Sequence, residues 1–252
     1  MVIIRDEKRI ERMQRISRYA SLLGIAALIG GLVIAFTNPE RFFVYELIAL
    51  AVGWLLSQVG IYLGQRYVRD PRPDEVLDKA VKPAAKNGRM YHYVISSAPH
   101  VLLMPEGIVV FNPKFQRGKI RVTGTEKGDK WKQRGVGLRR FFGGESLGNP
   151  TKEVNSMVGA VAKHLRENAP EVEEVPIAPV VVFTEKGTQE LVIENPSVPV
   201  LHYEKLRGFL RQQWKRAEDK SKMERADYEA IRASLDRGAA DILPENEQVE
   251  EN

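Results

Sequence analysis

The amino-acid sequence predicts an α/β sandwich attached to an N-terminal hairpin of two transmembrane helices. Two apolar runs, Tyr19–Phe36 and Phe42–Leu63, are each long enough to cross a bilayer. After them come a helix pattern, several strand patterns, a second helix, further strands and a last helix, an order typical of an α/β sandwich. The 252 residues suffice for one mid-sized domain with attachments, and the absence of cysteine excludes disulfides and thiolate metal sites.

Residues 1–18 are predicted to form a basic helix on the cytoplasmic side of the membrane. Six basic residues lie in this segment and three follow the second apolar run, whereas the link between the runs holds Arg41 alone. Because basic residues concentrate on the cytoplasmic side, we expect a protein of the cytoplasmic (inner) membrane with two spans and both termini in the cytoplasm. The basic segment could also contact anionic lipid headgroups.

The transmembrane hairpin is predicted over residues 19–64. Tyr19–Phe36 is 18 residues without a charge, which is roughly 27 Å of helix and close to the hydrocarbon core of a bilayer. A cleaved signal peptide and a buried soluble hairpin are the alternatives, but no A-x-A cleavage site follows and a second span comes at once. Small residues recur every four positions, as at Ala27, Gly31 and Ala35, and serve either packing within the hairpin or homo-oligomer formation.

The soluble domain, predicted over residues 73–217, is organised around the stretch Pro99–Lys114. Two apolar runs there flank Pro105-Glu106-Gly107, which predicts a buried β-hairpin. The remaining elements follow in order. We expect a helix from Pro73, strands at Tyr91–Ile95 and Lys119–Val122, a helix from Asn149-Pro150, strands at Pro179–Thr184, Leu191–Ile193 and Val198–Leu201, and a helix from Tyr203 to about Ala217.

The C-terminal part of the chain is predicted to be less ordered. A weaker apolar pattern through Tyr228, Ile231 and Leu235 predicts a helical extension over residues 218–240, either solvated or bound to a partner. Residues 241–252 hold five acids and no base, which predicts a disordered acidic tail.

The central hairpin resembles that of the nuclease-related domain (NERD) family, a branch of the PD-(D/E)xK nuclease fold. The resemblance also rests on Trp131 after a basic turn, on the Leu147-Gly148-Asn149-Pro150 helix start and on the late PVVVFT strand, and it runs from about Asp74 to Arg211. It implies a nuclease scaffold in which an Asp on the first strand and a Glu-x-Lys on the second hold a divalent metal and activate water.

This sequence departs from that pattern at both acids. The Asp position is Pro99, the Glu position is Asn112, and Lys114 alone keeps its type. A hard cation such as Mg²⁺ needs anionic oxygen ligands, so we expect neither a metal site nor a cofactor, and no catalytic residue. Glu75 and Glu153 are the possible substitutes, and Mg²⁺ becomes relevant if they form a displaced site. His100 is expected to be structural.

A basic segment with an aromatic residue follows the hairpin and is interpreted as a loop. It could bind nucleic acid, lie against anionic lipid, or be a solvated loop whose Trp131 packs on the sheet. Its members are Arg117, Lys119, Arg121, Lys127, Lys130, Trp131, Lys132, Arg134, Arg139 and Arg140.

Three functional hypotheses follow. The first is a membrane-anchored nuclease-like domain that is catalytically inactive and acts as a cytoplasmic interaction or scaffold module. The second is a membrane-tethered, metal-dependent nuclease that uses relocated carboxylates, and the third is a nucleic-acid binder that does not cleave. The lipid bilayer is an expected partner in all three, and the protein partner is not identified by the sequence.

Overall fold

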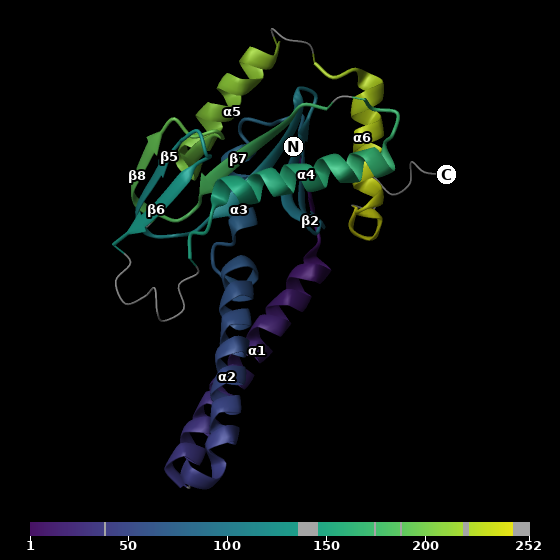
Figure 1. Ribbon diagram of the computed structural model, residues 1–252. Helices are drawn as coiled ribbons and strands as arrows, with labels where there is room; N and C mark the ends of the chain where they lie inside the picture. The colour runs from purple at the N-terminus through teal and green to yellow at the C-terminus, as the bar shows by residue number, and fades with distance from the viewer. Residues whose placement is uncertain (38, 136–145, 174, 187, 219–221, 244–252) are drawn as a thin grey trace. The chain divides into compact units, whose positions relative to one another are not determined.

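Figure 1 shows the computed structural model of the chain, which describes residues 1–37, 39–135, 146–173, 175–186, 188–218 and 222–243. Two compact units are present. One contains Met1–Glu7 and most of the chain from Pro73 onward, and the other contains Lys8–Arg72. The first unit has the predicted α/β architecture and the second is helical.

A six-stranded mixed sheet is the centre of the α/β unit. Its strand order is β1-β2-β3-β4-β7-β9. The β2-β3 and β3-β4 pairs are antiparallel, whereas β1-β2, β4-β7 and β7-β9 are parallel. The strands are β1 (Val2–Arg5), β2 (Arg89–Ile95), β3 (Ala98–Met104), β4 (Gly107–Lys114), β7 (Ile177–Phe183) and β9 (Val200–His202).

The predicted central hairpin is confirmed as β3 and β4. Gly107 forms the turn with a φ of 139°, a conformation that residues with a side chain rarely adopt. Both strands are almost wholly buried, because apolar side chains alternate between two helical layers. Val109 and Phe111 face one layer, and Ile108 and Val110 face the other.

Helices cover both faces of this sheet. Leu77 of α3 and Leu206 of α5 pack in the cluster that holds Phe111, whereas Val161 of α4 packs in the cluster that holds Val110. In Figure 1, α4 crosses the near face of the sheet. The Asn149 side chain accepts a hydrogen bond from Lys152 N at 3.1 Å, so the predicted cap of α4 is confirmed. The three helices are α3 (Pro73–Val81), α4 (Pro150–Asn168) and α5 (Tyr203–Glu218).

The predicted strand at Lys119–Val122 is confirmed, whereas the prediction of a loop is wrong for Lys130–Arg134, which form a further strand. β5 (Gly118–Thr123), β6 (Lys130–Arg134) and β8 (Thr188–Glu194) form a second, three-stranded sheet in the order β6-β5-β8. Ile120 and Val122 point into a core cluster with Leu147, while the charged residues between them are exposed. Arg139 and Arg140 lie outside the described residues.

The prediction of one helix over residues 1–18 is wrong at its start. Val2–Arg5 form β1, which pairs in parallel with β2, and the helix begins at Glu7. Ile4 is 1% exposed and packs with Tyr91. These residues form a strand, and do not extend the helix that follows, because pairing with the sheet edge buries their apolar side chains. The folded domain is therefore wider than residues 73–217.

The predicted helical extension over residues 218–240 is also corrected. α5 ends at Glu218, and a separate helix, α6, spans Arg225–Arg237. It packs on the face of the sheet that α4 covers. Ile231 and Leu235 are fully buried there, so this helix is neither solvated nor free for a partner on that side. A short 3₁₀ turn, η3 (Ala240–Ile242), follows. Residues 244–252 of the predicted acidic tail lie outside the described residues.

The helical unit consists of α1 (Glu7–Thr37), α2 (Pro39–Leu63) and the π-helical turn η1 (Gly64–Val68). Both long helices have the length and apolar composition needed to cross a membrane. A Cβ added to Gly60 would lie 3.0 Å from Ser21 N, and Ser17 Oγ donates a hydrogen bond to Gly60 O at 2.8 Å. Small residues thus serve packing within the hairpin. Large apolar side chains point outward, and Phe36 is 83% exposed.

Candidate functional site

The candidate site lies where β4 ends beneath the N-terminus of α4. Strand alternation places Asn112 and Lys114 on the same face as Val110, which is the face that α4 covers. Val101 of β3 pairs with Val110 of β4. Continuing this register by two residues places Pro99 opposite Asn112. The positions that the resemblance identified therefore share one face of the sheet.

Asn112 is a buried structural amide at this site. Its side chain is 3% exposed, and Nδ2 donates to Pro150 O at 3.1 Å and to Glu153 Oε2 at 3.3 Å. Because both contacts use the amide nitrogen, Asn112 presents a donor to the carboxylate. An amide that helped to hold a cation would present its oxygen.

Lys114 pairs with the carboxylate of Glu153. Its side chain is 5% exposed, and Nζ contacts Glu153 Oε2 in a salt bridge. The Glu153 side chain is 38% exposed, so it closes the site from the solvent side. A buried ammonium is costly without a counter-ion. Glu153 supplies that charge from the first turn of α4.

The structure brings together three of the residues that the sequence singled out and separates another. Asn112, Lys114 and Glu153 are in contact. Glu75 belongs to α3, whose core residues pack on the opposite face of the sheet. Pro99 offers no ligand atom in its side chain. The set Glu75, Glu153 and Asn112, considered as a displaced metal site, is therefore not assembled around one point by the described contacts.

These residues do not fit a divalent cation. Among the contacts of the described residues, the carboxylate of Glu153 is already paired with Lys114, and the neighbouring amide offers its nitrogen. Mg²⁺ requires several oxygen ligands in near-octahedral geometry. Within the described ranges, no three His, Asp or Glu side chains converge in a way that could hold a metal ion.

Trp131 is turned into the protein and fixes the second sheet to α4. Its Nε1 donates to Thr151 Oγ1 at 3.0 Å, and Thr151 Oγ1 donates to Asp129 Oδ2 at 2.7 Å. The Trp131 ring lies 6.2 Å from the ring of Phe183, centroid to centroid. Asp129 also accepts from Ser197 N at 3.0 Å. Trp131 therefore lies in a strand, with its ring packed against the core of the domain.

The outer face of the second sheet carries the basic residues that the sequence identified. In the antiparallel β5-β6 ladder, Lys119 lies opposite Arg134 and Arg121 lies opposite Lys132. Like charges placed directly opposite each other destabilise a sheet. Lys119 and Arg121 are offset by Glu190 at 3.1 Å and Glu194 at 3.4 Å on β8. A shallow groove of about 360 Å³ runs over this face.

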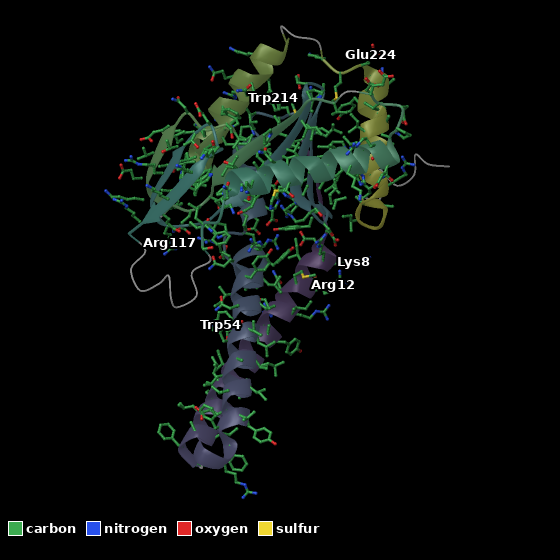
Figure 2. All side chains as sticks on the ribbon, in the orientation of Figure 1. Lys8, Arg12, Trp54, Arg117, Trp214 and Glu224 are labelled. Atoms are coloured by element: carbon green, nitrogen blue, oxygen red, sulfur yellow. The ribbon has the colours of Figure 1, made fainter. Side chains whose placement is uncertain are left out.

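Other residues of the predicted basic segment lie at the margin of this face. Arg117, which is labelled in Figure 2, precedes β5 and pairs with Glu185 at 3.4 Å. Lys130 is the first residue of β6 and lies opposite Thr123. Lys127 belongs to the connection between β5 and β6.

A buried polar cluster on the other face of the sheet was missed by sequence reasoning. His92 Nδ1 lies 2.8 Å from His100 Nδ1, and His92 Nε2 lies 2.9 Å from Asp78 Oδ1. Arg5 of β1 pairs with Asp78 and, at 2.9 Å, with Asp74. Its members come from β1, α3, β2 and β3, so no local sequence signal could have identified it. The structural role expected of His100 agrees with this placement.

Burial lowers the pKa of His100 well below its ordinary value. Desolvation of the charged imidazole is the main cause, and His92 and Arg5 add to it. His100 is therefore neutral in the folded protein at neutral pH. In the same cluster, Arg5 pairs with the two aspartates of α3.

Comparison with known families agrees with this geometry. Residues 86–184 match the model of the nuclease-related domain (NERD), a segment that extends from just before β2 to just after β7 and includes the candidate site. Comparisons with curated proteins and with solved structures gave no significant match.

Proposed function

We propose that this chain, which carries a nuclease-related domain at residues 86–184, is anchored in a membrane and acts as an interaction or scaffold module that does not cleave nucleic acid. One observation carries the proposal. The carboxylate of Glu153 is held by Lys114 and by the amide nitrogen of Asn112. The ammonium group thus stands next to the carboxylate that a metal ion would need, and Pro99 supplies no replacement.

Membrane anchoring is supported by the composition and by the connectivity of the hairpin. The helices α1 and α2 expose large apolar side chains that a bilayer would cover. The chain enters the hairpin from Met1–Glu7 and leaves it into Pro73, and both segments belong to one folded unit. Because a folded domain occupies one side of a bilayer, two crossings are needed. The basic residues of residues 1–18 favour the cytoplasm as that side.

A cleavage assay tests the proposal. Full-length protein in detergent is incubated with DNA or RNA and either Mg²⁺ or Mn²⁺, beside the variant Lys114→Ala. We expect no cleavage above the buffer control from either protein. Metal-dependent cleavage by the wild type that disappears in Lys114→Ala would overturn the proposal.

A second candidate function is a tethered nuclease built on a relocated carboxylate. It is favoured by the position of Glu153 against Asn112 and Lys114, where a metal ligand would be needed. This candidate predicts that Glu153→Gln abolishes cleavage, while Glu75→Gln tests whether α3 contributes. Mg²⁺ is its cofactor, so chelation of divalent ions would remove the activity.

We also propose that the outer face of β5 and β6 binds an anionic lipid surface. The glutamates of β8 pair with Lys119 and Arg121, and an anionic partner would offset the charges of Arg134 and Lys132, which lie opposite them. Trp131, the one aromatic residue of these two strands, is turned inward and cannot stack on a base. Nucleic-acid binding is therefore the less favoured alternative for this face.

Reconstituted protein distinguishes the two anionic partners. Protein in neutral-lipid nanodiscs is mixed with phosphatidylserine or phosphatidylcholine vesicles, or with labelled DNA and RNA. We expect binding to phosphatidylserine that falls with added salt and is lost when Lys130, Lys132 and Arg134 are changed to Glu. The control Lys163→Glu alters an exposed cation on α4 and should leave binding unchanged. Binding to nucleic acid alone would contradict the assignment.

A further inference from the structure

A second concave surface lies at the opposite end of the β3-β4 hairpin from the candidate site. It is a groove of about 330 Å³ between the start of β7 and the C-terminal half of α5, with a largely apolar lining. The apolar walls come from Ile177, Pro199 and Phe209. Three side chains with polar atoms, those of Glu106, Gln213 and Trp214, also line it, and Figure 2 labels Trp214 on α5.

Two of these side chains, Glu106 and Trp214, have a buried atom without a hydrogen-bond partner among the described residues. Trp214 Nε1 and Glu106 Oε2 are shielded from solvent, and neither has a hydrogen-bond partner among the residues that the structure describes. A buried donor or acceptor left unpaired destabilises the folded protein. One groove therefore holds an unused N–H donor and an unused carboxylate oxygen. A ligand with an acceptor and a cationic donor would satisfy both.

The edge of β7 beside this groove is open over its first four residues. β7 pairs with β4 from Ile177 onward, but with β9 from Val181 onward. Ile108 N donates to Pro176 O and Val181 N donates to Pro199 O. In a parallel ladder, this alternation directs the main-chain groups of Ile177 and the carbonyl of Pro179 away from β4. Four residues of strand span ~13 Å, enough for a short extended peptide.

We propose that this groove binds a short extended segment of a partner protein, with an apolar side chain in the groove, a main-chain carbonyl that accepts from Trp214 Nε1, and a Lys or Arg that pairs with Glu106. The chemistry follows from the three observations together. An open strand edge is complementary to a peptide main chain, and an unpaired carboxylate is complementary to a cation. The inference rests on the proposed role as an interaction module and names the class of partner.

Selection from a peptide library tests this assignment. Full-length protein in neutral-lipid nanodiscs is used to select from a phage-displayed random heptapeptide library, and selected peptides are synthesised with a fluorescent label. We expect sequences that combine a Lys or Arg with a large apolar residue and lack acids. Fluorescence anisotropy should give a Kd that rises at least about fivefold in Trp214→Phe and in Glu106→Gln, which is ~1 kcal/mol.

The matched control is Trp131→Phe. It removes an indole N–H that already has a partner, Thr151, inside the domain, so the Kd of the peptide should stay within about twofold. Trp214→Phe should fold with an unchanged or higher Tm, because its N–H has no partner to lose. A lower Tm for Trp214→Phe would show that the N–H is used inside the protein and would overturn the assignment.

Two further outcomes would also overturn it. One is a library that yields no binder. The other is a set of binders whose Kd is the same for wild type, Trp214→Phe and Glu106→Gln. Failure here is distinguishable from failure of the proposed function, because cleavage is measured separately. A cleaving protein that binds these peptides refutes the non-cleaving role alone, and a non-cleaving protein without peptide binding refutes this inference alone.

Discussion

At the scale of single residues, Lys114 and Glu153 determine the chemistry of the candidate site. Lys114 is the one position of the family pattern at which this sequence has the expected residue type. The acid that pairs with it, Glu153, comes from α4 and not from β4. The sequence identified each of these residues as a candidate, but it gave no indication that the two form a pair. A contact between β4 and α4 depends on the packing of a helix 39 positions further along the chain, which local patterns do not encode.

Removing Glu153 should destabilise the domain. In Glu153→Ala, the ammonium of Lys114 stays buried and loses its carboxylate, and because Glu153 is partly exposed we expect a loss of ~1–2 kcal/mol in the free energy of unfolding. Thermal unfolding measures the change. Glu167→Ala, on the exposed side of the same helix, is the control and should unfold at the wild-type temperature.

The neutral His100 should make stability depend on pH. Its pKa is lowered in the folded protein, so the unfolded chain binds a proton that the folded protein does not, and stability falls as the pH drops below about 6.5. His92 and Arg5 act on it directly, the Tyr93 ring lies 5.1 Å from it, and Asp78 and Asp74 pair with His92 and Arg5. In His100→Gln, the fall in Tm between pH 7.5 and pH 5.5 should be smaller than in the wild type. An equal or larger fall would contradict this account.

At the scale of elements, the sequence predicted those whose signal is local. The turn at Gly107 with its flanking apolar runs, the Asn149-Pro150 start of α4 and the apolar run of β7 each carry their own signal. β1 and β6 lack such a signal. β1 is four residues long and pairs with a strand more than 80 positions away. In β6, exposed basic residues alternate with the inward-facing Trp131 and Gln133, so the strand has little apolar signal.

The sequence did not predict that α6 packs on the domain, because polar contacts hold this helix as well as apolar ones. Arg89, which is 6% exposed, donates to Asp236 of α6 at 3.0 Å, and Tyr91 OH donates to the same carboxylate at 2.7 Å. Asp236→Ala should therefore remove the carboxylate that accepts from both Arg89 and Tyr91, and cost ~3–5 kcal/mol of stability. Chemical denaturation measures it. A cost below ~1 kcal/mol would mean that α6 is a dispensable attachment.

On the outer face of the second sheet, replacing a basic residue by an acid should stabilise the fold and weaken binding to anionic lipid. Lys132→Glu places an acid opposite Arg121, so it should raise the free energy of unfolding by ~0.2–1 kcal/mol while weakening binding to phosphatidylserine vesicles. Denaturation and vesicle co-flotation on the same variant give both values. Loss of stability, or unchanged binding, would contradict the role given to this face.

At the scale of the whole molecule, the two-helix hairpin is inserted into the folded domain. β1 precedes the hairpin and α3 follows it, and both belong to one unit. The two apolar runs of the sequence lie within α1 and α2, but the sequence patterns assigned the residues of β1 to a helix outside the domain. The insertion was not predictable, because it depends on the pairing of β1 with β2.

This connectivity predicts that both ends of the proposed membrane hairpin lie on one side of the bilayer, and the basic residues within 1–18 favour the cytoplasm as that side. The chain contains no cysteine, so single substitutions give clean reporters. In intact cells, cysteines at Lys8 and Lys163 should be protected from a membrane-impermeant maleimide, whereas a cysteine at Arg41 should be labelled. All three should react after permeabilisation. Labelling of Lys8→Cys in intact cells would place the domain outside the cytoplasm.

Binding of Mn²⁺ to the full-length protein tests the central claim most directly, because the account holds that Lys114 stands next to the carboxylate that a metal ion would need. Electron paramagnetic resonance of free Mn²⁺ measures binding without requiring a substrate. We predict that wild type and Glu153→Gln leave the same concentration of free Mn²⁺ in solution. Binding by the wild type that is lost in Glu153→Gln would contradict the account and establish a metal site on α4.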